Sequence, residues 1–226
     1  MSENFPGGET NPEALAASGN EAGTQAEART GSSTEQDLER LHPAIWIGSL
    51  LDYNNGILHG DWMDAARNDE DVQSDVRAIL GRSPTAQETG DIAEEWGIFD
   101  YEDFGDWRPG EYEDLTIVAA VARGISEHGP AFAAWADLHD ADPDMLMSFK
   151  DCYLGEYDSP EAWAKSWLEE TGSREELDQL LEEKVGDLAP YVRIDTGAWV
   201  QDAYLSGDIS ILHKDSGGVW VFRTNP

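Results

Sequence analysis

Hydrophobic residues recur along the first part of the chain with two different periods, which predicts short strands and one helix. AIWIGSL at 44–50 and ILHGDWMDA at 57–65 are apolar runs typical of strands, with a YNNG turn signal between them, and EEWGIFDYE at 94–102 is a third. DEDVQSDVRAIL at 69–80 carries its apolar residues at helical spacing. These elements predict a small unit of sheet and helix over residues 43–106.

The middle of the chain predicts only helices. EYEDLTIVAAVARGI at 111–125 gathers its apolar residues on one helical face. PAFAAWADLH at 130–139 and PDMLMSFKDCY at 143–153 each begin with a proline, which fits the first turn of a helix. We therefore expect a helical unit over residues 107–152.

The last part of the chain predicts three helices followed by a hairpin. Ser159 suits the N-cap of a helix that carries Trp163 and Trp167 on its inner side. The second helix begins SREE, in which Ser173 and Glu176 match a capping box. TGAWVQDAYLSG predicts the third helix, and ISILHKDSGGVWVFR predicts a closing hairpin. The residues expected to face inward from the second helix are Leu177, Leu180, Leu181 and Val185.

The predicted fold class is α+β, as an elongated chain of three small domains with an acidic surface throughout. Residues 1–40 are rich in Gly, Ser, Thr, Ala and Glu, a composition that cannot bury a core. The predicted division is a disordered acidic leader at 1–42, an N-terminal α+β domain at 43–106, a central helical domain at 107–152 and a C-terminal α+β domain at 153–226.

The balance of charge narrows the possible partners. The 226 residues include 47 acidic and 14 basic ones, which gives a formal net charge of −33 and a pI near 4.1. Residues 1–40 hold eight acids and two bases, so 39 acids and 12 bases belong to the folded part. Nucleic acid and anionic membranes bind through clusters of Lys and Arg and are excluded as partners. A cationic protein would instead be attracted.

Targeting signals are missing from the sequence. No apolar run approaches the roughly 20 residues of a membrane span, and the N-terminus does not have the basic and apolar pattern of a secretory signal. We therefore expect a cytoplasmic protein.

Residues capable of catalysis are few and scattered, so we expect neither an enzyme nor a cofactor. The chain contains no nucleotide-binding loop, nucleophile elbow or zinc-protease motif. His59 and Asp61 share a strand face and would be the centre of a hydrolase alternative, although a polar strand face accounts for them more simply. Cys152, the single cysteine, is expected to be a small buried residue.

One acidic stretch has part of the spacing of a calcium loop. Asp140, Asp142, Asp144 and Asp151 match its first, third, fifth and twelfth positions. The sharp turn at the sixth position needs Gly, and Met145 stands there. Asp142 more simply begins a helix, because the helix N-terminus favours acids. We therefore predict no metal site.

The carboxylates follow a pattern that costs stability. In the helix predicted at 173–185, Glu175, Asp178 and Glu182 share an outer face, where neighbours lie about 5–6 Å apart and repel one another. Residues 86–115 hold eleven acids and one base. A net charge of −27 beyond residue 40 equals the charge on about 46 Å of duplex DNA, at one charge per about 1.7 Å. Rigid carboxylates placed where phosphates stand would make this protein a mimic of DNA.

Residues 97–115 interleave seven acids with five aromatic residues. We expect these rings to fix the joint between the first two units, so that the acids point outward from a rigid frame. A flexible acidic tail would lose binding free energy to ordering. The aromatic residues are Phe99, Tyr101, Phe104, Trp107 and Tyr112.

The same charge is also compatible with two functions that involve no DNA mimicry. A halophile-adapted domain would carry acids over its whole surface and would unfold at low salt. An ordinary acidic interaction module would bind a basic partner without imitating DNA.

From about residue 43 to 223, the sequence resembles the ArdA antirestriction family. The stretches that carry the resemblance are LLDYNNGILHGDWMDA, AEEWGIFDYEDFG, FKDCYLGEYDSPEAWAKSWLEETG and DISILHKDSGGVWVFR. The resemblance implies a DNA mimic, made by plasmids, phages and other mobile elements, that occupies the DNA-binding groove of type I restriction–modification enzymes. It also implies a curved, elongated homodimer joined through its C-terminal region, without cofactor or catalysis.

We expect carboxylates of all three folded units to take the place of phosphates. Glu161, Glu169 and Glu170 lie where the resemblance places the family's antirestriction motif. The predicted partner-binding set is Glu94, Glu95, Asp100, Glu102, Asp103, Asp106, Glu111, Glu113, Asp114, Glu156, Asp158, Glu161, Glu169, Glu170, Glu175, Asp178 and Glu182.

Overall fold

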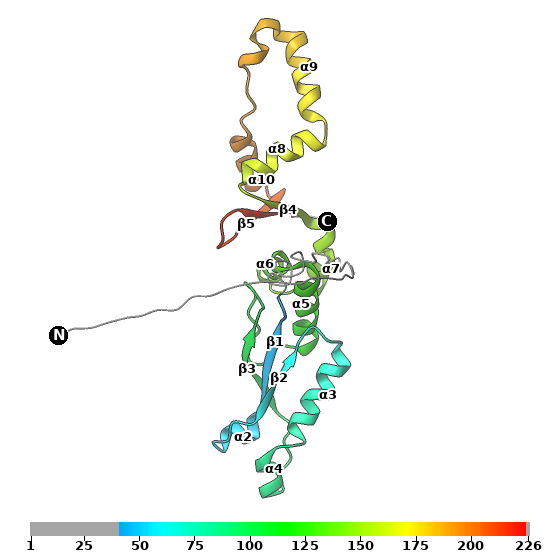
Figure 1. The fold of residues 1–226 in the computed structure, drawn as a ribbon, viewed down its shortest axis with the longest axis vertical. Coiled ribbons are helices and arrows are strands. Elements are labelled where there is room, and N and C mark those ends of the chain that lie inside the picture. Colours follow the sequence, from blue (N-terminus) through cyan, green and yellow to red (C-terminus); the bar gives the residue numbers. More distant parts are fainter. Residues whose placement is uncertain (1–40, 225–226) are drawn as a thin grey trace, which may run out of the picture.

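The computed structural model describes residues 41–224, which form a body much longer than it is wide (Figure 1). The predicted leader at 1–42 lies almost entirely outside these residues. Within them the fold is α+β, with two antiparallel three-stranded sheets and nine α-helices. The predicted α+β class is confirmed, whereas the division into three domains and the acidic surface throughout stay predictions. No helix in the described range is both long and apolar enough to cross a bilayer.

The first sheet, sheet A, contains the three strands predicted in the first part of the chain. Its order is β2-β1-β3, with both neighbours antiparallel to the central strand. Ile45 and Ile47 of the central strand point to one side and are fully buried, because alternate residues of a strand share a face. The strands are β1 (Ala44–Ser49), β2 (Gly60–Asp64) and β3 (Trp96–Glu102).

The helix predicted at 69–80 is present as α3 (Asp69–Leu80), and it buries Val72, Val76, Ile79 and Leu80. Its N-cap is Asn68, whose side chain accepts a hydrogen bond from the Asp71 amide at 2.9 Å. The contacts of α3 with β1 and β2 cover one face of sheet A.

Two short helices near the lower end of sheet A in Figure 1 were not predicted. Helix α2 (Leu50–Asn54) begins directly after β1, so the YNNG turn signal starts inside a helix. Helix α4 (Pro84–Thr89) begins at a proline that follows α3 closely. The two are tied together because the buried Asp52 carboxylate accepts a hydrogen bond from the Thr85 amide at 2.9 Å.

The central helices occur as predicted, each begun by a capping residue or proline. Asp114 caps the first, and its carboxylate accepts from the Thr116 amide at 2.8 Å. Prolines occupy the first turn of the other two. The helices are α5 (Leu115–His128), α6 (Pro130–Leu138) and α7 (Pro143–Cys152).

The last part of the chain surrounds the second sheet, sheet B, whose order is β4-β6-β5. The predicted hairpin forms two of its strands, and the third, β4, was not predicted. Ser159 is an N-cap and Gly207 a left-handed C-cap, as the sequence indicates. The elements are β4 (Tyr153–Tyr157), α8 (Pro160–Glu170), α9 (Ser173–Val185), the 3-10 helix η1 (Gly186–Tyr191), α10 (Thr196–Ser206), β5 (Ile209–His213) and β6 (Val219–Arg223).

Helix α9 corrects two predictions. Its N-cap is Gly172 without a side-chain hydrogen bond, so the capping box from Ser173 to Glu176 does not form. None of its residues is buried, and Leu180 keeps 53% of its surface exposed. The apolar stripe of Leu177, Leu180, Leu181 and Val185 therefore lacks a core within the described chain. In Figure 1, α9 and η1 form an arc that projects away from sheet B.

The buried hydrophobic residues of the described chain form two clusters, and β6 belongs to both. Trp220 and Phe222 pack in the larger cluster with sheet A and α5–α7. Val219 and Val221 pack in the smaller cluster with Trp163 of α8 and Val200 of α10. Because alternate residues face opposite sides, sheet B has a core on each face.

The tryptophans of α8 differ in burial. Trp163 is 4% exposed and stacks on Trp199 with ring centroids 5.4 Å apart. Trp167 is 40% exposed at the edge of this pair. The inward position predicted for Trp163 is confirmed. Trp167 is only partly buried, so its predicted inward position is confirmed only in part.

Candidate functional site

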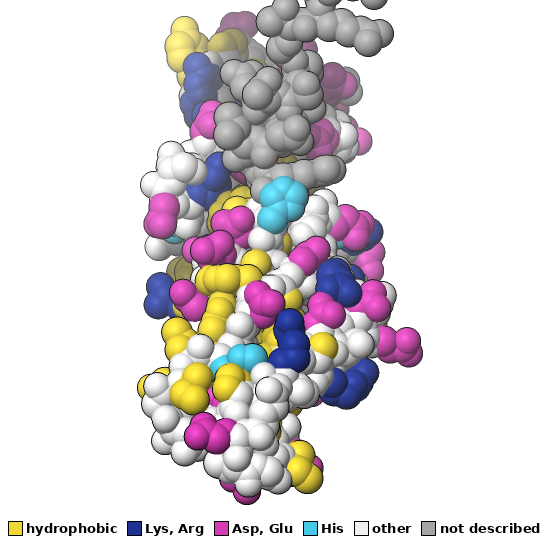
Figure 2. Space-filling view, turned by 60° about the horizontal axis from the view of Figure 1, so that its bottom comes forward, with side chains coloured by type: hydrophobic (Ala, Val, Ile, Leu, Met, Phe, Trp, Pro, Cys, Tyr) yellow, Lys and Arg dark blue, Asp and Glu magenta, His cyan; other side chains and the backbone are white. Residues whose placement is uncertain are grey.

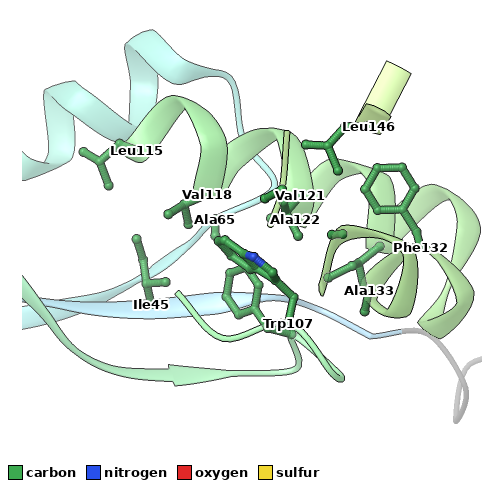
Figure 3. Close-up of a cluster of buried hydrophobic side chains, with 14 of the residues drawn as sticks. Ile45, Ala65, Trp107, Leu115, Val118, Val121, Ala122, Phe132, Ala133 and Leu146 are labelled. Atoms are coloured by element: carbon green, nitrogen blue, oxygen red, sulfur yellow. The ribbon is translucent and has the colours of Figure 1, made fainter. Parts of the chain in front are cut away.

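The acidic stretch at 97–115 is anchored by two of its five rings. Phe104 and Trp107 are buried, and Figure 3 shows Trp107 in a cluster with Val118 and Ile45. Tyr112 is 68% exposed, and Tyr101 is partly exposed with its edge on Phe104. The prediction that all five rings fix this joint is therefore wrong, because β3 turns Phe99 to the opposite face of sheet A, where it stacks on Trp46.

The predicted carboxylates lie on the surface, as a partner-binding role requires. Sixteen of the seventeen are exposed, and Glu113 is half-buried. Several belong to positions where the backbone is fixed. Asp103, for example, has a positive φ of 61° and accepts a hydrogen bond from the His42 amide at 3.2 Å.

Ion pairs within the described chain separate the acids of the first half of the molecule into a paired set and an unpaired set. Arg67 pairs with Asp71 and Asp75, and Arg123 pairs with Asp69 at 2.9 Å. Further pairs join Arg82 to Asp61 and Lys150 to Glu127. These pairs neutralise acids of β2, α3 and α5, and Lys150 of α7 is the cation that pairs with α5.

A second segment, around β3, keeps its acids without cationic partners among residues 41–224. It includes β3 and the chain that leads from it into α5. We call these nine carboxylates the unpaired stripe: Glu94, Glu95, Asp100, Glu102, Asp103, Asp106, Glu111, Glu113 and Asp114.

Two predicted carboxylates outside this stripe are engaged within the protein. Glu156 pairs with Lys214, and its other oxygen accepts from Trp220 Nε1 at 3.2 Å. The hydrogen bond from Lys214 is the main cause that lowers the pKa of Glu156. Asp178 pairs with Arg174 at 2.9 Å. Both carboxylates are locally neutralised and contribute less to the outward field than their exposure suggests.

One carboxylate of the unpaired stripe lies near acids from distant parts of the chain. Burial raises the pKa of Asp106, and the charges of Asp215 and Asp137 raise it further, against the opposing effect of Arg108. The fold thus concentrates negative charge where α6 and the β5–β6 hairpin approach the stripe. Asp215 and Asp137 were not in the predicted set, and their spacing in the sequence offers no signal.

The residues considered for catalysis or metal binding have structural roles. The ring of His59 makes a 2.8 Å hydrogen bond with the Ile79 carbonyl and so ties β2 to α3. Cys152 is fully buried, as predicted. Asp142 caps α7 by accepting from the Asp144 and Met145 amides, which confirms the simpler interpretation of that acidic stretch. Within the described residues, no group of three or more His, Cys, Asp or Glu side chains is placed to hold a metal ion.

Comparison with protein families shows the relationship of the chain. The family model described as "ArdA: Antirestriction protein (ArdA)" matches residues 45–216, which include both sheets up to the β5–β6 turn. No curated protein matches the chain.

Proposed function

Because the chain belongs to the ArdA family of antirestriction proteins, a group of non-enzymatic DNA mimics that inhibit type I restriction–modification enzymes, we propose that the unpaired stripe occupies the phosphate positions. Its carboxylates would contact the basic DNA-binding groove of the target enzyme. The elongated body of the three predicted units would lie along that groove.

The observation that carries this proposal is the uneven pairing of acids in the first half of the molecule. Asp61 of β2 and three acids of α3, Asp69, Asp71 and Asp75, are neutralised by neighbouring arginines, whereas the acids of β3 and the following chain are free of such pairs within the described residues. An acid already paired offers little to a partner, since its cation must first be displaced. The stripe therefore presents the larger field to a basic groove.

A competition experiment tests this assignment with two matched sets of three neutralised acids. Labelled duplex is bound to the purified methyltransferase core of a type I enzyme and displaced by the protein. The first variant carries Asp100→Asn, Glu102→Gln and Asp103→Asn in the unpaired stripe. The second carries Asp69→Asn, Asp71→Asn and Asp75→Asn in the paired set, and circular dichroism checks the fold of both.

We expect the stripe variant to need at least tenfold more protein, because each exposed charge contributes up to about 1 kcal/mol. The loss should shrink as salt rises, since screening weakens the same contacts in the wild type. The variant with Asp69, Asp71 and Asp75 replaced should displace the duplex nearly as well as the wild type. Equal losses in both variants would contradict the assignment of the stripe, and no displacement by the wild-type protein would contradict DNA mimicry itself.

We also propose that two copies of the chain associate through α9, η1 and α10. Large apolar side chains that lack a core are concentrated there: Leu180, Leu188, Tyr191, Tyr204 and Leu205 are each more than half exposed. A concentration of exposed apolar side chains is typical of protein interfaces. The segment also carries Arg174, Lys184 and Arg193, which moderate the repulsion between two acidic copies.

Sedimentation at physiological salt tests the dimer. Leu180→Glu combined with Tyr191→Glu should convert the dimer to a monomer, because it places charges on the apolar surface. Met147→Glu is the control, since Met147 is 77% exposed on α7 and lies outside the proposed interface. A wild-type protein that sediments as a monomer would rule the interface out.

A further inference from the structure

The outer face of sheet A, opposite α3, carries a group of aromatic rings. Trp46 lies between the buried Ile45 and Ile47 and therefore points to this outer face. Trp62 of β2 stands directly opposite Trp46 in the strand register. Phe99, the extra residue of a bulge in β3, stacks on Trp46 with ring centroids 5.6 Å apart. Tyr53 of α2 completes the group at 5.1 Å from Phe99.

A row of glycines across sheet A lets these rings lie against the backbone. Gly48 is paired with Gly60 on one side and with Gly97 on the other. A Cβ at Gly48 would come within 2.6 Å of both the Trp46 and the Phe99 ring, and one at Gly60 would lie 2.2 Å from the Ile47 carbonyl. The rings thus form a low platform fixed on the strands rather than a set of freely moving side chains.

The platform remains accessible in the described chain. Trp62 is 41% and Tyr53 is 59% exposed, and α2 is the element that reaches this face, at one end of the sheet. Together, Tyr53, Trp46, Phe99 and Trp62 are called the aromatic platform below.

Carboxylates border the platform in the same strands. Asp100 is the register partner of Trp46, and Ala44 stands between Asp64 on β2 and Glu102 on β3. None of these three acids forms an ion pair within residues 41–224. In the face shown in Figure 2, hydrophobic side chains lie between acidic ones. A ligand of this surface must therefore contact both the aromatic rings and the neighbouring carboxylates.

We propose that the aromatic platform binds arginine side chains of the target enzyme, which rests on the function proposed above. A guanidinium group stacks on aromatic rings and pairs with carboxylates at the same time, whereas a lysine ammonium is a compact, strongly hydrated point charge. The platform adds a contact that DNA phosphates do not provide and that salt weakens little.

Charge favours a cationic partner over two other possible occupants of the platform, which are residues 1–40 and a second copy of the chain. Residues 1–40 hold eight acids and two bases, and a second copy carries the same net charge of −33. Both would be repelled by the carboxylates around the platform. A cationic segment would be attracted.

Binding of two short peptides to the full-length protein tests the platform without the target enzyme. Hexa-arginine and hexa-lysine carry the same charge, so a difference between their affinities reports contacts that are specific to the guanidinium group. We expect about two- to fivefold tighter binding of hexa-arginine, the effect of one exposed cation–π contact. Isothermal titration at several salt concentrations measures both peptides.

The variant Tyr53→Ala/Trp62→Ala removes the exposed rings and should abolish the preference for hexa-arginine. Tyr112→Ala is the matched control, because Tyr112 is a similarly exposed ring that lies beside α3 instead. The proposal is overturned if the wild type binds both peptides equally, or if the double variant keeps the preference. It is also overturned if the double variant changes the sedimenting mass, since the platform would then join two copies.

The competition assay separates this proposal from DNA mimicry. The double variant should displace duplex DNA less well than Tyr112→Ala, with a loss that persists at high salt. A double variant as potent as the wild type would exclude the platform from the interface and leave the role of the carboxylates intact.

Discussion

Sheets A and B are built alike, yet one is covered on both faces and the other on one. Each has three antiparallel strands, and each central strand is apolar on both sides, AIWIGS in β1 and VWVFR in β6. Helices pack on both faces of β6, so it contributes to both hydrophobic clusters. In β1, Trp46 and its neighbouring rings lie on a face that only the short helix α2 reaches among the described helices, and only at one end.

This difference separates two uses of a hydrophobic strand. Sheet B connects the central helices to the last part of the chain, because its opposite faces belong to different cores. Sheet A instead packs on the core with one face only, and its outer face carries aromatic rings surrounded by acidic side chains. Its outer face is a surface whose hydrophobic area contributes little to the stability of the monomer, so binding is the simpler reason for it.

Phe222→Ala should have the largest effect on stability. Phe222 is fully buried at the centre of sheet B, and its ring packs 4.9 Å from Trp135 and 5.4 Å from Tyr153. Loss of a buried phenyl ring lowers the free energy of unfolding by about 3–5 kcal/mol. Urea unfolding measures it, with Met147→Ala on the exposed side of α7 as control. A loss below about 1 kcal/mol would contradict the role given to sheet B.

Asp52→Asn should weaken the support beneath sheet A by about 2–3 kcal/mol near neutral pH, because hydrogen bonds to a buried charge are lost. Burial alone would raise the pKa of Asp52, but the nearby hydroxyl groups of Ser49 and Ser83 and the hydrogen bond from the Thr85 amide outweigh it and hold the pKa far below its usual range. The charged form therefore stabilises the fold above about pH 4. As the pH falls further, that contribution declines.

The difference between wild type and Asp52→Asn should accordingly shrink between about pH 4 and pH 2. Thermal melts at several pH values measure it. Glu88→Gln is the control, since Glu88 lies exposed on α4. A difference that stays constant with pH would mean that the charge of Asp52 is not what joins α2 to α4.

Gly60→Ala should cost about 1–3 kcal/mol, the usual effect of overpacking. The new Cβ would lie 2.2 Å from the Ile47 carbonyl and 2.5 Å from the Trp46 ring, so the backbone must shift. Gly110→Ala is the control, because a Cβ there meets nothing closer than 3.4 Å. Tryptophan fluorescence would report movement of the platform, and an unchanged spectrum with unchanged stability would show that the rings do not rest on the glycine row.

Trp62→Ala should have the smallest effect on stability, below about 1 kcal/mol, because the ring is already 41% exposed. The same change should weaken binding to hexa-arginine. Substitution in the core of sheet B would thus lower stability, whereas substitution on the outer face of sheet A would lower binding of the peptide. A loss as large as that of Phe222→Ala would mean that the outer face of sheet A is a core after all.

The local periodicity of the sequence predicted most elements with close boundaries. Residues 69–80 form α3 as expected, and the helices begun by Pro130, Pro143 and Pro160 start where their prolines predicted. The elements that were not predicted have physical causes. Pro84 signals the end of α3, but with Ser83 as a cap it also begins α4. Strand β4 escaped notice because its pairing partner β6 lies more than sixty residues away.

The candidate site was less predictable than the fold. Exposure of the acids follows from their composition, but their pairing depends on which arginines the fold brings near them. Arg123 of α5 reaches Asp69 across 54 residues, a contact that no local pattern reveals. Similarly, the inward stripe expected in α9 follows correctly from the spacing of its apolar residues, but burial needs a partner surface, and the described chain supplies none there.

The shared membership of β6 in two cores also has a consequence for folding. Strand β4 can pair with β6 only after α8, α9 and α10 have been looped out, and closing so long a loop slows folding because its entropy is lost before the contacts form. Once β6 is in place, neither core can open without exposing one side of it. Unfolding should therefore be a single cooperative transition that joins both halves of the molecule, and amide exchange in β6 should be among the slowest in the protein.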